Sequence, residues 1–176
     1  MNPFDQQPKQ QWFSDSDIEH MSGGYSYLVR KCWSHSQIGF HDVVTILEPG
    51  CGRGAMTLAL LQNFSNATIY LIDYYLNLVP SVNKSKVHQK LGKFDNVFQK
   101  GTYSDLDLIV LSYLSDSHGI RATQIELLAS YLRPNRHLLT IGDNGNLLSN
   151  PLIPKLFQIT YQHGIMPEDG VLWSKK

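Results

Sequence analysis

Charge, cysteine and long apolar runs are all scarce in this chain of 176 residues. Charged residues make up 17%, and fifteen basic and fifteen acidic side chains cancel, which argues against a strongly basic nucleic-acid binder. Two cysteines, Cys32 and Cys51, cannot build a disulfide framework, so we expect a reducing, cytoplasmic setting. No apolar run approaches the roughly 18 residues of a membrane-spanning helix, and residues 1–11 lack the apolar stretch of a secretory signal.

The chain does have enough apolar residues, 42%, for one domain with one core. We expect residues 1–13, which are rich in glutamine, to form a mobile N-terminal arm. Residues 14–40 predict an N-terminal helical segment that is interrupted at Gly23-Gly24, as two short helices or a bend, because glycine weakens a helix. Residues 41–176 predict a single α/β domain.

The α/β prediction comes from an alternation of apolar runs and helix-forming stretches. Strands are expected at 43–47, 67–72, 96–100, 106–114, 137–141 and 171–173, and helices at 55–64, 120–132 and 150–162. Strands that are apolar on both faces and alternate with helices indicate a doubly wound, mostly parallel sheet that is covered on both sides. Such folds bind ligands at the carboxyl ends of their strands.

A glycine-rich loop lies at one of these strand ends. Gly50, Gly52 and Gly54 follow a strand and open a helix, where glycine permits a tight turn and a close approach of the backbone to a ligand. Asp73 ends the next strand, where a carboxylate can accept hydrogen bonds from the hydroxyl groups of a ribose. Together these residues predict a ribose-containing cofactor. The spacing Gly50-x-Gly52-x-x-Ala55 also fits a dinucleotide site, so NAD stays an alternative.

Three features carry a family resemblance: the Glu-x-Gly-x-Gly-x-Gly pattern of Glu48–Gly54, Asp73, and the Leu-Arg-Pro turn at 132–134. Over about residues 43–143 the sequence resembles the class I S-adenosylmethionine-dependent methyltransferases. The resemblance implies a Rossmann-like fold and S-adenosylmethionine as cofactor. The fold of that family ends in an antiparallel hairpin, but only twelve residues follow Gly164. We therefore expect part of the hairpin to be missing, either in a natural short form or in a fragment. A homodimer or a partner subunit would then cover the open sheet edge.

The resemblance also assigns site residues. The cofactor-binding set that it implies is Glu48, Gly50, Cys51, Gly52, Gly54, Asp73, Tyr74, Thr102 and Ser112. In this set Thr102 stands after the expected third strand, near the place of the adenine. The candidate catalytic residues are Tyr113, at the end of the fourth strand, and the possible bases His118 and Asp143. No cluster of histidine and cysteine indicates a metal site, and Cys51 is expected to be a packing residue.

The predicted function is methyl transfer from S-adenosylmethionine to a small molecule, without a membrane partner. Nucleic acid is disfavoured as a partner by the neutral charge and by the absence of the Asn/Asp-Pro-Pro-Tyr motif. One alternative is a methyltransferase-like binding or scaffold protein with little or no turnover, and another is an NAD-dependent oxidoreductase. A basic stretch of four lysines, at 84, 86, 90 and 93, predicts a solvated face and leaves phosphate or nucleic-acid binding as a weaker alternative.

Overall fold

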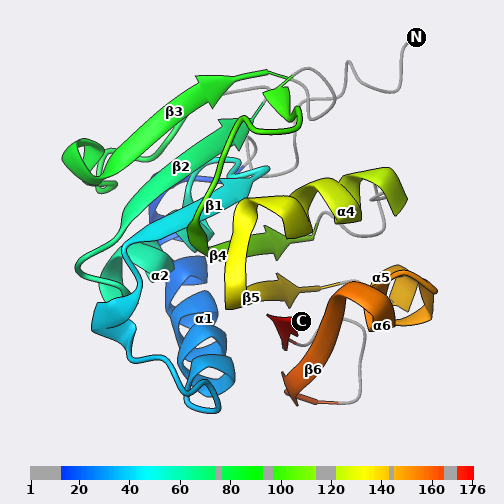
Figure 1. The fold of residues 1–176 in the computed structure, drawn as a ribbon. Helices are drawn as coiled ribbons and strands as arrows, with labels where there is room; N and C mark the ends of the chain where they lie inside the picture. Colours follow the sequence, from blue (N-terminus) through cyan, green and yellow to red (C-terminus); the bar gives the residue numbers. More distant parts are fainter. Residues whose placement is uncertain (1–12, 74–76, 93–96, 114–121, 143–144, 165–169) are drawn as a thin grey trace, which may run out of the picture.

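A computed structural model of the protein describes residues 13–73, 77–92, 97–113, 122–142, 145–164 and 170–176. Within these ranges a seven-stranded sheet has the order β3-β2-β1-β4-β5-β7-β6 (Figure 1). The strands are β1 Thr45–Pro49, β2 Thr68–Asp73, β3 Val87–Leu91, β4 Leu106–Ser112, β5 Leu132–Ile141, β6 Phe157–Gln162 and β7 Gly170–Lys175. The first five strands are parallel, whereas β7 runs antiparallel to both β5 and β6. This arrangement confirms the predicted doubly wound, mostly parallel sheet.

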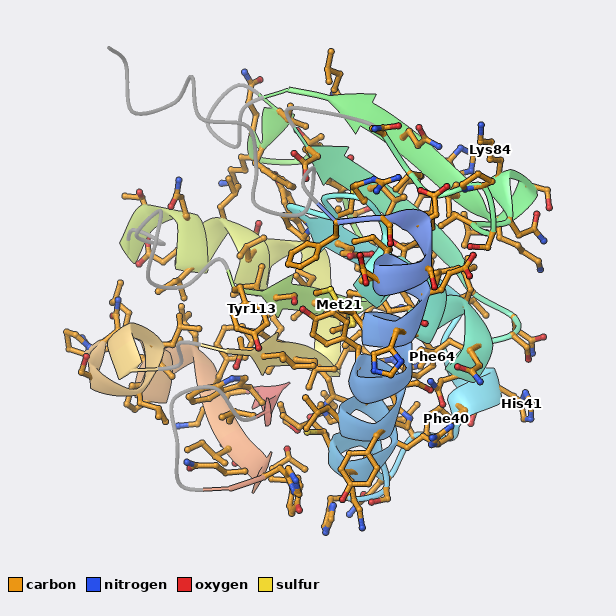
Figure 2. All side chains as sticks on the ribbon, turned by 180° about the vertical axis from the view of Figure 1, so that it is seen from behind. Met21, Phe40, His41, Phe64, Lys84 and Tyr113 are labelled. Atoms are coloured by element: carbon orange, nitrogen blue, oxygen red, sulfur yellow. The ribbon has the colours of Figure 1, made fainter. Side chains whose placement is uncertain are left out.

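Helices cover both faces of the sheet. On one face lie α1 (Asp15–Trp33) and α2 (Ala55–Asn63), and on the other lie α4 (Ala122–Tyr131), α5 (Gly145–Ser149) and α6 (Ile153–Leu156) (Figures 1 and 2). Alternate residues of the central strands serve the two faces: Ile46 packs into the core beneath α1 and α2, whereas Leu47 packs into the core beneath α4. None of the helices in the described ranges is both long and apolar enough to cross a membrane.

Helix α1 is continuous, so the predicted interruption at Gly23-Gly24 is wrong. A capping box begins the helix, in which Asp17 N donates to Ser14 Oγ at 3.1 Å and Ser14 N donates to Asp17 Oδ2 at 2.9 Å. Its buried face then offsets the cost of two glycines, because tertiary packing contributes most of the stability of a helix in a protein. That face consists of Ile18, Tyr25, Ser26, Val29, Cys32 and Trp33.

The third strand lies at Val87–Leu91 and not at the predicted 96–100. It pairs in parallel with β2, with Val87 opposite Ile69 and Leu91 opposite Asp73. Only Val87 is buried in this edge strand, so no apolar pattern identifies it in the sequence. The apolar residues Val97 and Phe98 do enter the core, but as part of a connecting segment.

The C-terminal hairpin is present, which contradicts the predicted abbreviation. The segment 150–162, predicted as one helix, contains the short helix α6 followed by β6, which pairs with β7. Its second half, with Phe157, Ile159, Thr160 and Tyr161, has the β-branched and aromatic residues that favour a strand. The inference that a partner subunit covers an unfinished sheet edge therefore loses its premise.

Candidate functional site

The loop between β1 and α2 has a backbone that requires glycine. Gly50, Gly52 and Gly54 have φ angles of 69°, 53° and 95°, in the left-handed region that other residues avoid. At Gly54 a Cβ atom would also lie 3.1 Å from both Leu78 Cδ2 and Val82 Cγ2. The loop therefore has three backbone positions without side chains at the amino end of α2. The N–H groups at a helix start favour a polar or anionic ligand.

Asp73 holds this loop against β2. Its carboxylate, at the last residue of β2, accepts a hydrogen bond from Gly52 N at 2.6 Å. A second bond, from Gly50 N to Ile72 O at 2.6 Å, fixes the other end of the turn. Asp73 is buried, with 8% of the residue exposed, at the carboxyl end of β2. The sequence suggested a ligand-binding role for Asp73 but not its bond to the loop.

Glu48 lies beneath the loop and is almost completely buried. Thr57 Oγ1, from α2, donates a hydrogen bond to Glu48 Oε2 at 2.7 Å. Burial raises the pKa of Glu48 to about 8, the bond from Thr57 lowers it in part, and the charge of Asp73 raises it further. Thr57 was not identified from the sequence, where the only signal is its place three residues after the last loop glycine.

The raised pKa of Glu48 predicts a pH-dependent loss of stability. The unfolded chain ionises this carboxyl near its ordinary pKa of 4.5 and the folded chain near 8, so folding stability falls as the pH rises between these values. Glutamine keeps the polar contact without ionising. We expect the stability gained by Glu48→Gln over the unchanged chain to grow from pH 4.5 upward. It should reach roughly 3 to 5 kcal/mol near pH 8.

Urea unfolding at a series of pH values measures this gain. A second variant, Glu126→Gln, replaces an exposed carboxyl and serves as the control, since its stability curve should run parallel to that of the unchanged chain. A Glu48→Gln curve that also runs parallel would show that Glu48 does not carry the pH dependence.

Cys51 is the third buried titratable residue at the loop. It is 2% exposed, and burial, together with the nearby Glu48 and Asp73, raises the pKa of its thiol. A thiol of this kind stays protonated and packs as a small apolar group. The described residues contain no group of three metal-ligating side chains.

A pocket of about 290 Å³ lies beside the end of β4. Its lining residues are Met21, Gly24, Tyr25 and Leu28, which occupy one face of α1, and Tyr113, which follows β4 (Figure 2). The rings of Tyr25 and Tyr113 are 6.4 Å apart and inclined at 58°. Burial raises the pKa of Tyr25 to about 12, and the side chain of Ser112 lowers it in part. The pocket therefore combines apolar walls with phenol groups at its edge.

The orientation of Tyr113 depends on its neighbours in β4 and β5. Tyr113 has a positive φ of 55°, and its backbone N–H donates to Ile141 O at 2.8 Å. Its ring passes over Gly142, where an added Cβ would lie only 2.5 Å from two ring carbons. A glycine at this position is thus required for the observed placement of Tyr113 beside the pocket.

Many solved chains are similar in structure to this one at low sequence identity. One of them is yhhF from Escherichia coli, described as a candidate methyltransferase. It is 12% identical to this chain over 87% of this chain and 86% of its own length, with a TM-score of 0.67. The N-methyltransferase NodS from Bradyrhizobium japonicum, in complex with S-adenosylhomocysteine, is 17% identical over 95% and 91% of the two chains, with a TM-score of 0.59. The chain has the Rossmann-like fold of the S-adenosylmethionine-dependent methyltransferases.

A third structure with the methyltransferase fold, a SAM-dependent methyltransferase from Aquifex aeolicus, is 13% identical and matches 93% of this chain and 100% of that chain, with a TM-score of 0.59. No family model matches the sequence, and no curated protein matches it. These comparisons therefore show a similarity of fold alone.

Within the methyltransferase fold, the structure brings some of the predicted site residues together and separates one from the rest. Glu48, the loop glycines, Cys51 and Asp73 form one cluster, and Ser112 and Tyr113 lie at the adjacent end of β4. Thr102 lies elsewhere, because the third strand ends nine residues earlier than predicted. It accepts a bond from Gln99 N at 3.1 Å and lines a separate pocket. The predicted residues Tyr74, His118 and Asp143 lie outside the described residues.

Arg53 connects the glycine loop to the beginning of α1. Its guanidinium donates to the backbone oxygen of Phe13 and forms an ion pair with Asp15, in the first turn of the helix. This contact was not apparent from the sequence, since it joins residues about 40 positions apart. The loop and α1 therefore hold each other in place.

Proposed function

We propose that this protein transfers a methyl group from S-adenosylmethionine to a small-molecule acceptor. The observation that carries the proposal is the bare glycine turn whose Gly52 N–H bonds the carboxylate of Asp73 at 2.6 Å, at the carboxyl edge of the sheet. The presence of S-adenosylhomocysteine in NodS, which shares the fold, supports the choice of cofactor.

The residues present fit this cofactor. Gly50, Gly52 and Gly54 would let its methionine part approach the backbone closely, because these three left-handed positions carry no Cβ. Asp73 would accept hydrogen bonds from the ribose hydroxyl groups, since its carboxylate lies at the carboxyl end of β2 beside the glycine loop. Glu48 would support the loop from below through Thr57, and Ser112 would border the cofactor from β4.

When bound, the cofactor supplies an electrophilic methyl group on a sulfonium. The protein's part is to align an acceptor with that group, which requires positioning more than a strong base. Tyr113 and Tyr25 would place the acceptor between α1 and the end of β4, against the apolar side chains of α1. We retain Tyr113, His118 and Asp143 as the proposed catalytic residues, with Tyr74 beside the adenine.

Calorimetry with S-adenosylmethionine, S-adenosylhomocysteine and NAD tests the cofactor directly. We expect both S-adenosyl compounds to bind and NAD to give no heat. NAD binding alone would instead favour an oxidoreductase, and failure of all three to bind at millimolar concentration would refute the proposal. Cofactor binding without a methylated product from any acceptor would favour the binding or scaffold alternative.

The size of the pocket predicts which change in α1 blocks the acceptor. Gly24 lines the pocket and a Cβ added to it meets nothing within 4 Å, so Gly24→Leu should extend a side chain into the empty volume. We expect about a ten-fold or greater loss of binding for small aromatic amines and phenols. Ligand-observed NMR with aniline, phenol and indole measures this loss in the presence of S-adenosylhomocysteine.

Gly23→Leu is the matched control. Gly23 precedes Gly24 in the same helix, also has open space at its Cβ, and does not line the pocket. Both changes should stabilise the helix by about 0.5–1 kcal/mol, because leucine is a better helix former than glycine. An equal loss of binding in both variants would show that the pocket does not receive the acceptor.

A further inference from the structure

Three aromatic side chains, Tyr70, His88 and Tyr103, lie together beside β2 and β3, at the edge of the region that α4 covers. Tyr103 contacts Tyr131, the last residue of α4, with ring centroids 5.5 Å apart. In Figure 1, α4 lies in front of β4, whereas β2 and β3 extend beyond it. Tyr70 of β2 packs partly against the core on the α4 side, and His88 of β3 is its direct partner across the strands. The two rings are stacked, 5.3 Å apart and inclined at 19°. Tyr103 contacts Tyr70 at 5.4 Å from the segment before β4.

These rings border a shallow pocket of about 370 Å³. Its lining residues are Tyr70, His88, Gln89, Lys90, Thr102 and Tyr103. None of them is an acid, and none lines the pocket beside Tyr25 and Tyr113. The pocket is therefore a separate site with its own chemistry.

The cation of the pocket comes from β3. Lys90 follows His88 by two residues, so the two side chains point to the same side of the strand. Asp and Glu are absent from the described segment 77–92, which also contains Lys84 and Lys86. An anionic group bound beside Lys90 would therefore meet no carboxylate from this segment.

The combination of stacked rings, a lysine and neutral hydrogen-bonding groups selects a class of ligand. Aromatic side chains exposed on a sheet surface stack on nucleobases, and a neighbouring lysine pairs with a phosphate. Thr102 adds a hydroxyl group that can hydrogen-bond to the edge of a base. We propose that this pocket binds a pyrimidine or purine nucleotide, with the base against the rings and the phosphate at Lys90.

The charge of the protein limits the size of this ligand. With zero net charge and one lysine in the pocket, the contact extends to about one or two phosphates. The ligand is thus a free nucleotide or a short single-stranded segment, and both present the same base and phosphate.

Binding of uridine monophosphate tests the proposal independently of the methyltransferase site. A pyrimidine avoids the adenosine-binding part expected near Asp73, and saturating S-adenosylhomocysteine is added as a further block. Ligand-observed NMR at low salt compares uridine monophosphate, uridine and inorganic phosphate. We expect the monophosphate to bind about ten-fold more tightly than uridine, because the phosphate adds one charge-assisted contact.

Two surface variants separate the contributions of ring and charge. Lys90→Gln should reduce the affinity for uridine monophosphate to that for uridine, whereas Lys84→Gln, in the same basic segment but outside the pocket, should leave it unchanged. His88→Ala should weaken both ligands by about five-fold or more through the loss of stacking. All three positions are exposed, so the variants keep the core intact.

The outcomes are decisive in each direction. No binding of uridine monophosphate at millimolar concentration, equal binding of uridine and its monophosphate, or equal effects of Lys90→Gln and Lys84→Gln would overturn the proposal. A tetrauridylate offers the pocket four nucleotides, so chance alone allows it up to about four-fold tighter binding than uridine monophosphate. Binding tighter than this identifies single-stranded nucleic acid as the source of the nucleotide. Equal affinity per nucleotide identifies the free nucleotide. A negative calorimetric result with S-adenosylmethionine would leave this test unaffected.

Discussion

Replacing Asp73 with alanine should weaken the binding of S-adenosylmethionine by about 100-fold, since each hydrogen bond to a charged group contributes about 1.5–3 kcal/mol. The change removes the proposed acceptor of the ribose hydroxyl groups. It also removes the partner of Gly52 N, so the glycine turn loses the bond that fixes it to β2. Calorimetry of the unchanged chain and of the variant measures the difference.

Two further variants serve as comparisons for Asp73→Ala. Asp73→Asn keeps an oxygen for Gly52 N but has no charge, so its affinity should lie between those of the alanine variant and the unchanged chain. Asp42→Ala removes an exposed carboxylate that bonds only locally to Gly39 N, and should leave the affinity unchanged. Unchanged affinity in Asp73→Ala would show that the ribose does not bind there.

The largest loss of stability is expected at Asp107, at the opposite end of the sheet. Its side chain is completely buried near the start of β4. One carboxylate oxygen accepts bonds from Val44 N at 2.8 Å and Thr45 N at 3.1 Å, and the other forms ion pairs with Arg133 at 2.6 Å and Arg136 at 3.2 Å. Asp107→Ala should reduce the free energy of unfolding by about 3–5 kcal/mol, because two backbone donors and two cations lose their partner.

Guanidinium unfolding measures this loss, and Arg133→Gln serves as a milder comparison. Arg133 is partly exposed and Arg136 remains beside the carboxylate, so the arginine variant should lose much less stability than Asp107→Ala. The fraction of Asp107→Ala that stays folded should still bind S-adenosylmethionine, since the glycine loop lies at the other end of the strands. Equal stability of Asp107→Ala and the unchanged chain would contradict this role.

The parts of the fold that follow from local sequence were predicted correctly. β4 and α2 have strong apolar or helix-forming runs with clear ends, and their bounds differ from the predicted ones by one or two residues. β3 did not show such a signal, because only Val87 of this edge strand is buried, and the strand-favouring residues of β6 were included in a predicted helix. The segment before β6 also contains enough leucine and isoleucine to resemble a helix.

The candidate site divides in the same way. Glu48, the loop glycines and Asp73 were identified because they occupy the ends of consecutive strands that pair in the sheet. Tyr25 and Arg53 contribute through contacts with distant segments, which only the tertiary structure determines. The placement of Thr102 failed for a related reason, since it relied on a third strand that lies nine residues earlier than predicted.

The glycine loop and the pocket beside Tyr113 both contact helix α1. Helix α1 has 19 residues, about 28 Å in length, and is held to the glycine loop by Arg53 at its start and lines the pocket through Tyr25 at its middle. A ligand that orders the loop will therefore also order one wall of the pocket. We expect cofactor and acceptor to bind cooperatively, and the acceptor to raise the affinity for the cofactor by the same factor as the reverse.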